Sequence, residues 1–215
     1  MVGLLGKKLG QAQVYDGAGN LLCVTAVQCG PNRVLQCKTE KSDGYNAVQI
    51  GFGVQKAHRV NKPMAGHYEK HKGEPCQRIR EFRDFELDVK PGDELKPEDC
   101  FSAGDWVDAI GTTKGHGFQG VMKRHGYHGG RATHGAKGWK RRPGSIGQGS
   151  TPGHVRKGQP MPGHMGQVRR TVQNLKVVRV MENEQVLLIS GAVPGAVGDF
   201  VVIRGAKKKK KAAKA

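Results

Sequence analysis

One continuous stretch of this chain, residues 111–170, contains no aspartate and no glutamate. The same stretch holds 12 lysines and arginines, 16 of the 33 glycines and six of the nine histidines. It cannot neutralise its own charge, and its apolar content is too low for burial to offset the entropy lost on ordering. We therefore expect a basic, glycine-rich extension that a polyanion orders, rather than a domain with its own core.

The formal net charge of +18 lies entirely in this stretch and in the C-terminal tail, residues 207–215, which adds six lysines and no acid. Residues 1–110 and 171–206 together hold 18 basic and 18 acidic side chains. Because phosphates repeat densely and release counterions when they are neutralised, nucleic acid is the favoured partner. The sequence has no apolar run of about 18 residues and no signal-peptide pattern, so we expect no membrane partner.

The neutral parts of the chain have the pattern of short strands separated by turns. Strands are expected at 21–28, 33–38, 47–52, 78–86, 106–110, 172–181, 185–190 and 200–203. Seven or eight such strands favour a mainly β fold, a closed antiparallel barrel built from residues 1–110 and 171–206. Short helices are expected at 63–72, within a small insertion spanning 57–75, and at 118–124.

The basic stretch lies between the strand that ends at Ile110 and the strand that starts near Val172. Both of its ends are therefore attached to one rigid body, which makes it a long internal loop. At about 3.4 Å per residue its extended contour is roughly 200 Å, and the path out and back halves that reach. Loops of this length without structure of their own usually carry function.

Fifteen residues are candidates for contact with RNA. Arginine forks match phosphate geometry, and tryptophan and histidine rings stack on unpaired bases. Such contacts recognise shape and backbone more than sequence. The candidates are Lys114, Lys123, Arg124, Arg131, His134, Lys137, Trp139, Lys140, Arg141, Arg142, His154, Arg156, Lys157, Arg169 and Arg170.

The run Gly115–Gly120 matches the dinucleotide-binding pattern G-x-G-x-x-G, but that fingerprint needs a carboxylate about twenty residues further on. Here the corresponding region is Lys137–Arg142 (KGWKRR), and no parallel βαβ pattern surrounds it. We expect no nucleotide cofactor. The glycines more simply let backbone amides approach phosphates.

Two histidine groups suggest a metal site, but neither has four ligands at convincing spacing. They are His67 and His71 with Cys76, and His125 and His128 with His134. The five cysteines include no Cys-x-x-Cys pair, which is typical of reduced thiols. No nucleophile elbow occurs, and the acid-free stretch has no carboxylate to orient a histidine. We expect no metal, no cofactor, no small-molecule substrate and no enzymatic activity.

Six motifs, in order from residue 1 to about residue 204, resemble the bacterial-type ribosomal protein L-three family of the large subunit. They are MVGLLGKKLG at 1–10, KSDGYNAVQ at 41–49, GTTKGHGFQG at 111–120, RPGSIG at 142–147, TPG at 151–153 and GAVPG at 191–195. In some members a methylated glutamine precedes TPG. Here that position is Ser150, so the modification is not carried over. The lysines at 207–211 are not part of the shared pattern.

The resemblance implies a translation-protein-type antiparallel β-barrel with a small α/β insertion and a long irregular internal extension. It implies a structural protein that binds large-subunit rRNA early in assembly and contacts neighbouring large-subunit proteins. The tip of the extension, near residues 142–151, would reach toward the peptidyl transferase centre. The protein would work in the cytoplasm, within the ribosome, and would support the catalytic RNA without doing chemistry itself.

Two other functions stay open at this point. A general nucleic-acid chaperone would bind any duplex equally, so a preference for rRNA fragments over random DNA argues against it. A nucleotide-dependent enzyme would use Gly115–Gly120, and the absence of heat in a dinucleotide titration would dismiss it.

Overall fold

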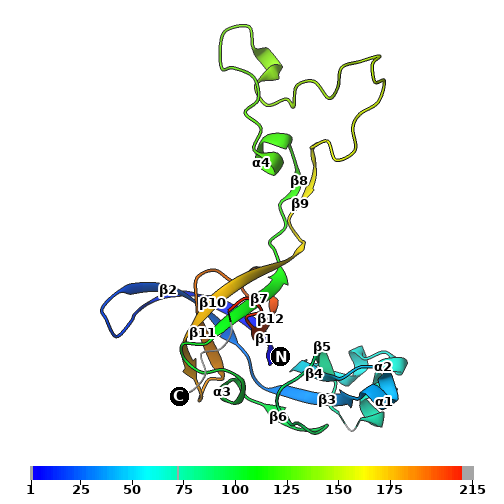
Figure 1. The fold of residues 1–215 in the computed structure, drawn as a ribbon, viewed down its shortest axis with the longest axis vertical. Helices are drawn as coiled ribbons and strands as arrows, with labels where there is room; N and C mark the ends of the chain where they lie inside the picture. The colour runs from blue at the N-terminus through cyan, green and yellow to red at the C-terminus, as the bar shows by residue number, and fades with distance from the viewer. Residues whose placement is uncertain (1, 72, 210–215) are drawn as a thin grey trace. The chain divides into compact units, whose positions relative to one another are not determined.

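The structure is a computed structural model that describes residues 2–71 and 73–209 (Figure 1). The chain forms two compact units. The first contains the residues up to 112 and those from 169 onward, and the second, residues 113–168, is inserted between them. Of the lysine-rich tail at 207–215, residues 210–215 lie outside the described part of the chain.

Six antiparallel strands close a barrel in the first unit, in the order β1-β12-β7-β10-β11-β2 (Figure 1). Fully buried aliphatic side chains such as Leu4, Val107 and Leu187 fill it. The strands are β1 (Gly3–Tyr15), β2 (Leu21–Gln28), β7 (Trp106–Thr112), β10 (Arg169–Met181), β11 (Val186–Ser190) and β12 (Phe200–Gly205). The expected mainly β fold with a closed antiparallel barrel is confirmed.

A second sheet in the same unit contains three strands that were expected in the barrel. Its order is β5-β4-β3-β6, with β3 (Asn32–Lys38), β4 (Ala47–Val54), β5 (Cys76–Arg83) and β6 (Glu94–Leu95). The expectation that all the strands close one barrel is therefore wrong. Alternation of apolar and polar residues indicates a half-buried strand but does not say which sheet the strand joins. Apolar residues of both sheets form one continuous core.

Strand β1 was missed from the sequence because its glycines and lysines interrupt the apolar alternation. These glycines allow close packing: a Cβ on Gly3 would overlap the Phe82 ring, and one on Gly6 would lie 2.7 Å from the Val27 side chain. β1 pairs with both β12 and β2, so it completes the barrel. The buried Lys8 ammonium donates to the carbonyls of Val193 (2.8 Å) and Gly195 (3.0 Å). Two of the motifs behind the family resemblance thus contact each other.

Helices are short throughout the described residues. The first unit has α1 (Glu40–Asp43), the 3-10 turn η1 (Ala57–Arg59), α2 (Lys62–Lys70) and α3 (Pro97–Cys100). Tyr68 of α2 is buried, and its hydroxyl donates to the carbonyl of Cys76 (3.0 Å) and accepts from the Cys76 amide (3.1 Å). This contact attaches α2 to the second sheet. No helix in the described chain is long and apolar enough to cross a membrane.

The side chain of Asn32 joins the barrel to the second sheet. It is fully buried at the start of β3, its Oδ1 accepts from the Leu5 amide (3.1 Å), and its Nδ2 donates to the carbonyls of Leu5 (2.9 Å) and Cys29. Without the Asn32 side chain, each of these three buried backbone groups would lose this hydrogen bond. An unmet buried donor or acceptor costs about 1–3 kcal/mol.

We predict that Asn32→Ala lowers the free energy of unfolding by about 2–4 kcal/mol, because it removes several buried hydrogen bonds at once. Urea denaturation followed by circular dichroism measures this. Asn20→Ala is the matched control, since Asn20 is exposed in a turn and its loss should cost about 0.5 kcal/mol or less. Equal losses for the two variants would contradict the role given to Asn32.

Candidate nucleic-acid interface

Residues 113–168, called the extension from here on, have almost no interior. All of them are described, and Val121 is the only buried one. Large apolar side chains lie in solvent: Phe118 is 76% exposed and Trp139 is 59% exposed. A segment with so little buried apolar surface gains little from its own packing to oppose the loss of chain entropy.

The extension begins and ends in a short ribbon. β8 (Gly117–Gln119) pairs antiparallel with β9 (Gly163–Met165), and α4 (Val121–His125) follows β8 directly. Arg124 of α4 donates from Nη1 to the Met161 carbonyl (2.6 Å), and Nε2 of His125 lies 3.1 Å from the same oxygen. These contacts tie α4 to the returning arm of the extension. Part of the Arg124 guanidinium, an expected RNA contact, is thus engaged within the protein.

At two points the extension packs backbone directly on backbone. Gly129 has a φ of +74°, and a Cβ there would overlap the carbonyl oxygen of Lys140. The next amide, that of Gly130, donates to the same oxygen (3.2 Å). Gly166 has a φ of +80°, and a Cβ there would likewise overlap the carbonyl oxygen of Lys114. Only glycine fits such positions without strain, so the glycine richness of this stretch serves close backbone approach.

Trp139 ends the 3-10 turn η2 (Lys137–Trp139) and borders an open hollow of about 470 Å³. The hollow is also lined by Tyr127, His128 and Arg142, whose guanidinium carbon lies 5.1 Å from the centre of the Trp139 ring. Exposed rings beside arginine suit stacking with an unpaired base, which is worth about 1–3 kcal/mol per base. Tyr127 and His128 were not among the fifteen expected contacts, although both lie in the acid-free stretch.

All fifteen expected contact residues are exposed. Thirteen of them lie in the extension, including ten lysines and arginines. The other two, Arg169 and Arg170, belong to β10 of the first unit, where they pair with Thr112 and Gly111. Their exposure leaves all fifteen accessible to a partner, and their contact with RNA stays a prediction.

The glycine motif at 115–120 has a different setting from that of a dinucleotide site. β8 is three residues long and antiparallel to β9, and α4 has five residues. The parallel βαβ unit that such a site requires is not formed there. In the part of the chain that the structure describes, no three His, Cys, Asp or Glu side chains gather as metal ligands. His67 instead shares a hydrogen bond with Gln49 (2.7 Å).

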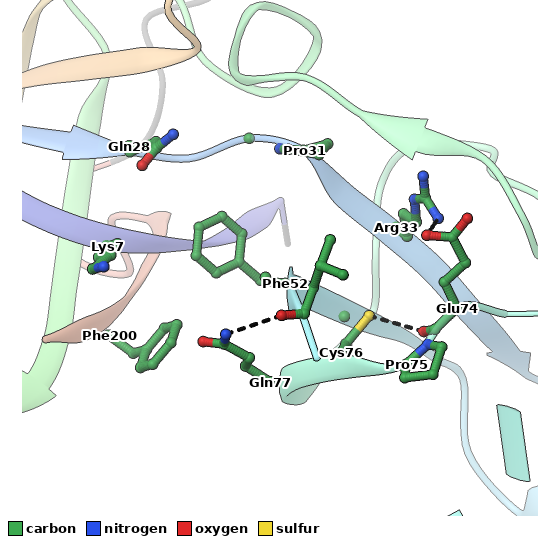
Figure 2. A pocket seen from close by; sticks show the side chains of 14 residues that line it. Lys7, Gln28, Pro31, Arg33, Phe52, Glu74, Pro75, Cys76, Gln77 and Phe200 are labelled. Atoms are coloured by element: carbon green, nitrogen blue, oxygen red, sulfur yellow. Dashed lines mark hydrogen bonds and ion pairs between the residues drawn. The ribbon is translucent and has the colours of Figure 1, made fainter. Parts of the chain in front are cut away.

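A hollow of about 280 Å³ in the first unit lies between the barrel and the second sheet (Figure 2). Phe52 and Phe200 meet edge to face there, with ring centres 6.0 Å apart. Its arginine is neutralised, because Arg33 pairs with Glu74 and with Glu94 (3.0 Å). Packed rings and paired charges are typical of the contact between two sheets. We therefore assign this hollow a structural role and not a binding role.

A folded barrel with an inserted, coreless and polycationic extension has the character of a structural nucleic-acid-binding protein. The family model described as ribosomal protein L3 matches residues 85–190.

Curated relatives named large ribosomal subunit protein uL3 are similar over almost the whole chain. The protein of Akkermansia muciniphila is 51% identical, over 97% of this chain and 99% of the relative. The protein of Thioalkalivibrio sulfidiphilus is 50% identical (97% and 99%), and that of Brachyspira hyodysenteriae is 45% identical (98% and 96%). The chain therefore belongs to the ribosomal protein L3 (uL3) family, as its sequence motifs indicated.

We predict that Trp139 fluoresces as a water-exposed indole in the free protein and that its emission changes when rRNA binds, because its exposed ring becomes covered. The measurement uses a Trp106→Phe background, so that Trp139 is the only fluorophore of its kind. Raising the salt concentration until the complex dissociates is the control and should restore the free spectrum. Emission unchanged at saturating rRNA would remove Trp139 from the interface.

Proposed function

We propose that this chain is a structural, rRNA-binding component of the large ribosomal subunit. Membership of the uL3 family supports the ribosomal assignment, since its relatives carry that name. One observation carries the RNA-binding mode: the extension presents ten basic side chains and no acidic one, and has a single buried residue. Such a segment needs a dense, repeating anion to neutralise it, and folded RNA provides one.

In this proposal the two units have different roles. The barrel folds through its own core and brings a rigid body to the subunit. The extension becomes ordered against RNA phosphates during early assembly and supports the RNA fold near the peptidyl transferase centre. Release of counterions from the neutralised phosphates opposes the entropy lost when the extension becomes ordered. Neighbouring large-subunit proteins contact the barrel, and the chain acts in the cytoplasmic ribosome without catalysing a reaction.

The test is the salt dependence of binding to large-subunit rRNA. We predict that Lys140→Gln with Arg141→Gln makes the slope of log affinity against log salt less steep by about 1.4, since each lost phosphate contact contributes about 0.7. Both side chains are exposed in the extension. The control, Lys41→Gln with Lys90→Gln, removes the same charge from exposed positions of the first unit and should leave the slope unchanged.

Two results would count against the proposal. One is an affinity of the wild-type chain for rRNA that does not depend on salt. The other is equal competition by random duplex DNA, which would favour a general nucleic-acid chaperone instead. A clear preference for rRNA, weakened by the extension variant and not by its control, supports the ribosomal role.

A further inference from the structure

We propose that the projecting part of the β1–β2 hairpin is a protein-docking site, where an extended, uncharged segment of a neighbouring large-subunit protein adds a strand to the outer edge of β1. The inference rests on the proposed function, because it takes the neighbours to be the proteins of that subunit. It goes beyond that function by naming the surface, the mode of binding and the chemistry of the partner.

Beyond the barrel, β1 and β2 continue as a two-stranded ribbon that projects from it (Figure 1). β12 pairs with β1 only over Gly3–Lys7, and β11 pairs with β2 only over Val24–Gln28. Among the described residues, the Gly10–Tyr15 part of β1 is therefore paired with β2 alone. The outer edge of this part of β1 has no strand beside it.

The hydrogen-bond alternation of an antiparallel pair indicates which backbone groups lie at that edge. The Asp16 amide donates to the Asn20 carbonyl (3.0 Å) at the end of the ribbon, and the register between the two strands is unshifted from there to residue 10. The amides and carbonyls of Gln11, Gln13 and Tyr15 therefore point away from β2. These are the donors and acceptors that an added strand would pair with.

The side chains of the same residues form an exposed, uncharged face of the ribbon. Tyr15 is 70% exposed and lies directly opposite Leu21, which is 50% exposed. Gln13 and Cys23 are the next opposite pair on this face, and both are exposed. An exposed tyrosine beside an aliphatic side chain, without charge around them, has the composition of the buried centre of a protein interface.

The charge of the hairpin favours protein over RNA as the occupant. Residues 9–32 contain no lysine, arginine or histidine, although the chain as a whole holds 36 lysines and arginines in 215 residues. The one charged side chain, Asp16, is engaged in the turn, where it accepts from the amides of Ala18 (2.9 Å) and Asn20 (2.8 Å). Because phosphates are bound chiefly by cationic side chains, a surface without them suits an uncharged protein segment.

The edge also lacks the features that protect a free strand from pairing. Exposed edges are commonly blunted by lysine, proline or a bulge. The outer edge over Gly10–Tyr15 has no lysine and no proline, and the bulge of β1 lies before it, between Lys8 and Gly10. A second copy of this chain is disfavoured as the occupant, because two chains of net charge +18 repel each other.

The first test uses the full-length chain assembled into the large subunit. A benzophenone amino acid replaces Tyr15, and light then cross-links it to the group that covers this position. We expect an adduct with one large-subunit protein, through a segment that contains no lysine or arginine. The control places the same amino acid at Trp139 of the extension, where the adduct should contain RNA.

A substitution tests the chemistry of the surface. With the benzophenone now at Leu21, Tyr15→Lys should lower the yield of the protein adduct by about tenfold, because an interface tyrosine is lost and a cation is left without a partner. Val197→Lys is the matched control, since Val197 is also 70% exposed in the first unit, and it should leave the yield unchanged. Urea unfolding should be the same for both variants, because neither position is in the core.

Hydrogen exchange tests the added strand itself. The amides of Gln11, Gln13 and Tyr15 should exchange rapidly in the free chain and slowly in the assembled subunit. The amides of Ala12 and Val14, which point toward β2, are the internal control and should be slower than these three in the free chain. Rapid exchange of the three edge amides in the subunit would overturn strand addition.

The cross-linking outcomes separate this proposal from the proposed function. An adduct of the Tyr15 site with RNA, with a lysine-rich segment or with a second copy of the chain overturns the docking site, and so does the absence of any adduct. A Leu21 adduct whose yield survives Tyr15→Lys has the same consequence. In all these cases the proposed function stands as long as the chain binds rRNA and enters the subunit. A wild-type chain that does neither contradicts the proposed function itself.

Discussion

The pairing of β7 with β10 is the constraint on which the arrangement of this chain depends. It contributes one seam of the closed barrel, and it holds together the two points where the extension leaves and re-enters, with Thr112 opposite Arg169 and Gly111 opposite Arg170. The ladder continues beyond these pairs through the Thr113 amide, which donates to the Val168 carbonyl (2.9 Å). The barrel fixes both ends of the extension, so the folding of the first unit offsets the entropy cost of closing this long loop. The extension therefore does not need a core.

What the extension has in place of a core is a small set of specific contacts and a uniform charge. The bond from Arg124 to Met161 and the close approach at Gly129 keep its two arms together. Val121 is its one buried residue, and the large side chains of Phe118 and Trp139 lie in solvent. Stability and recognition are thus separated along the chain. Apolar burial stabilises the first unit, and in the proposed function neutralisation by a polyanion orders the second.

The sequence predicted the separation into a folded body and a basic extension. It did not predict strand β1 or which strands form the second sheet, and both failures have a physical reason. The absence of acid at 111–170 predicted an exposed basic segment, because charge of one sign cannot be buried. Strand β1 was missed because Gly3, Gly6 and Gly10 suppress the alternation that indicates a strand. Strands β3, β4 and β5 were found but assigned to the barrel, since partner choice depends on contacts distant in sequence.

Whether RNA orders the extension can be measured by hydrogen–deuterium exchange of the intact chain, free and bound to large-subunit rRNA. We expect amides of residues 113–168 to exchange rapidly in the free protein and to become protected in the complex. Amides of the buried barrel strands, such as those of Val107 and Leu187, should be slow in both states. Protection of the extension in the free protein equal to that of the barrel would contradict the claim that RNA supplies its order.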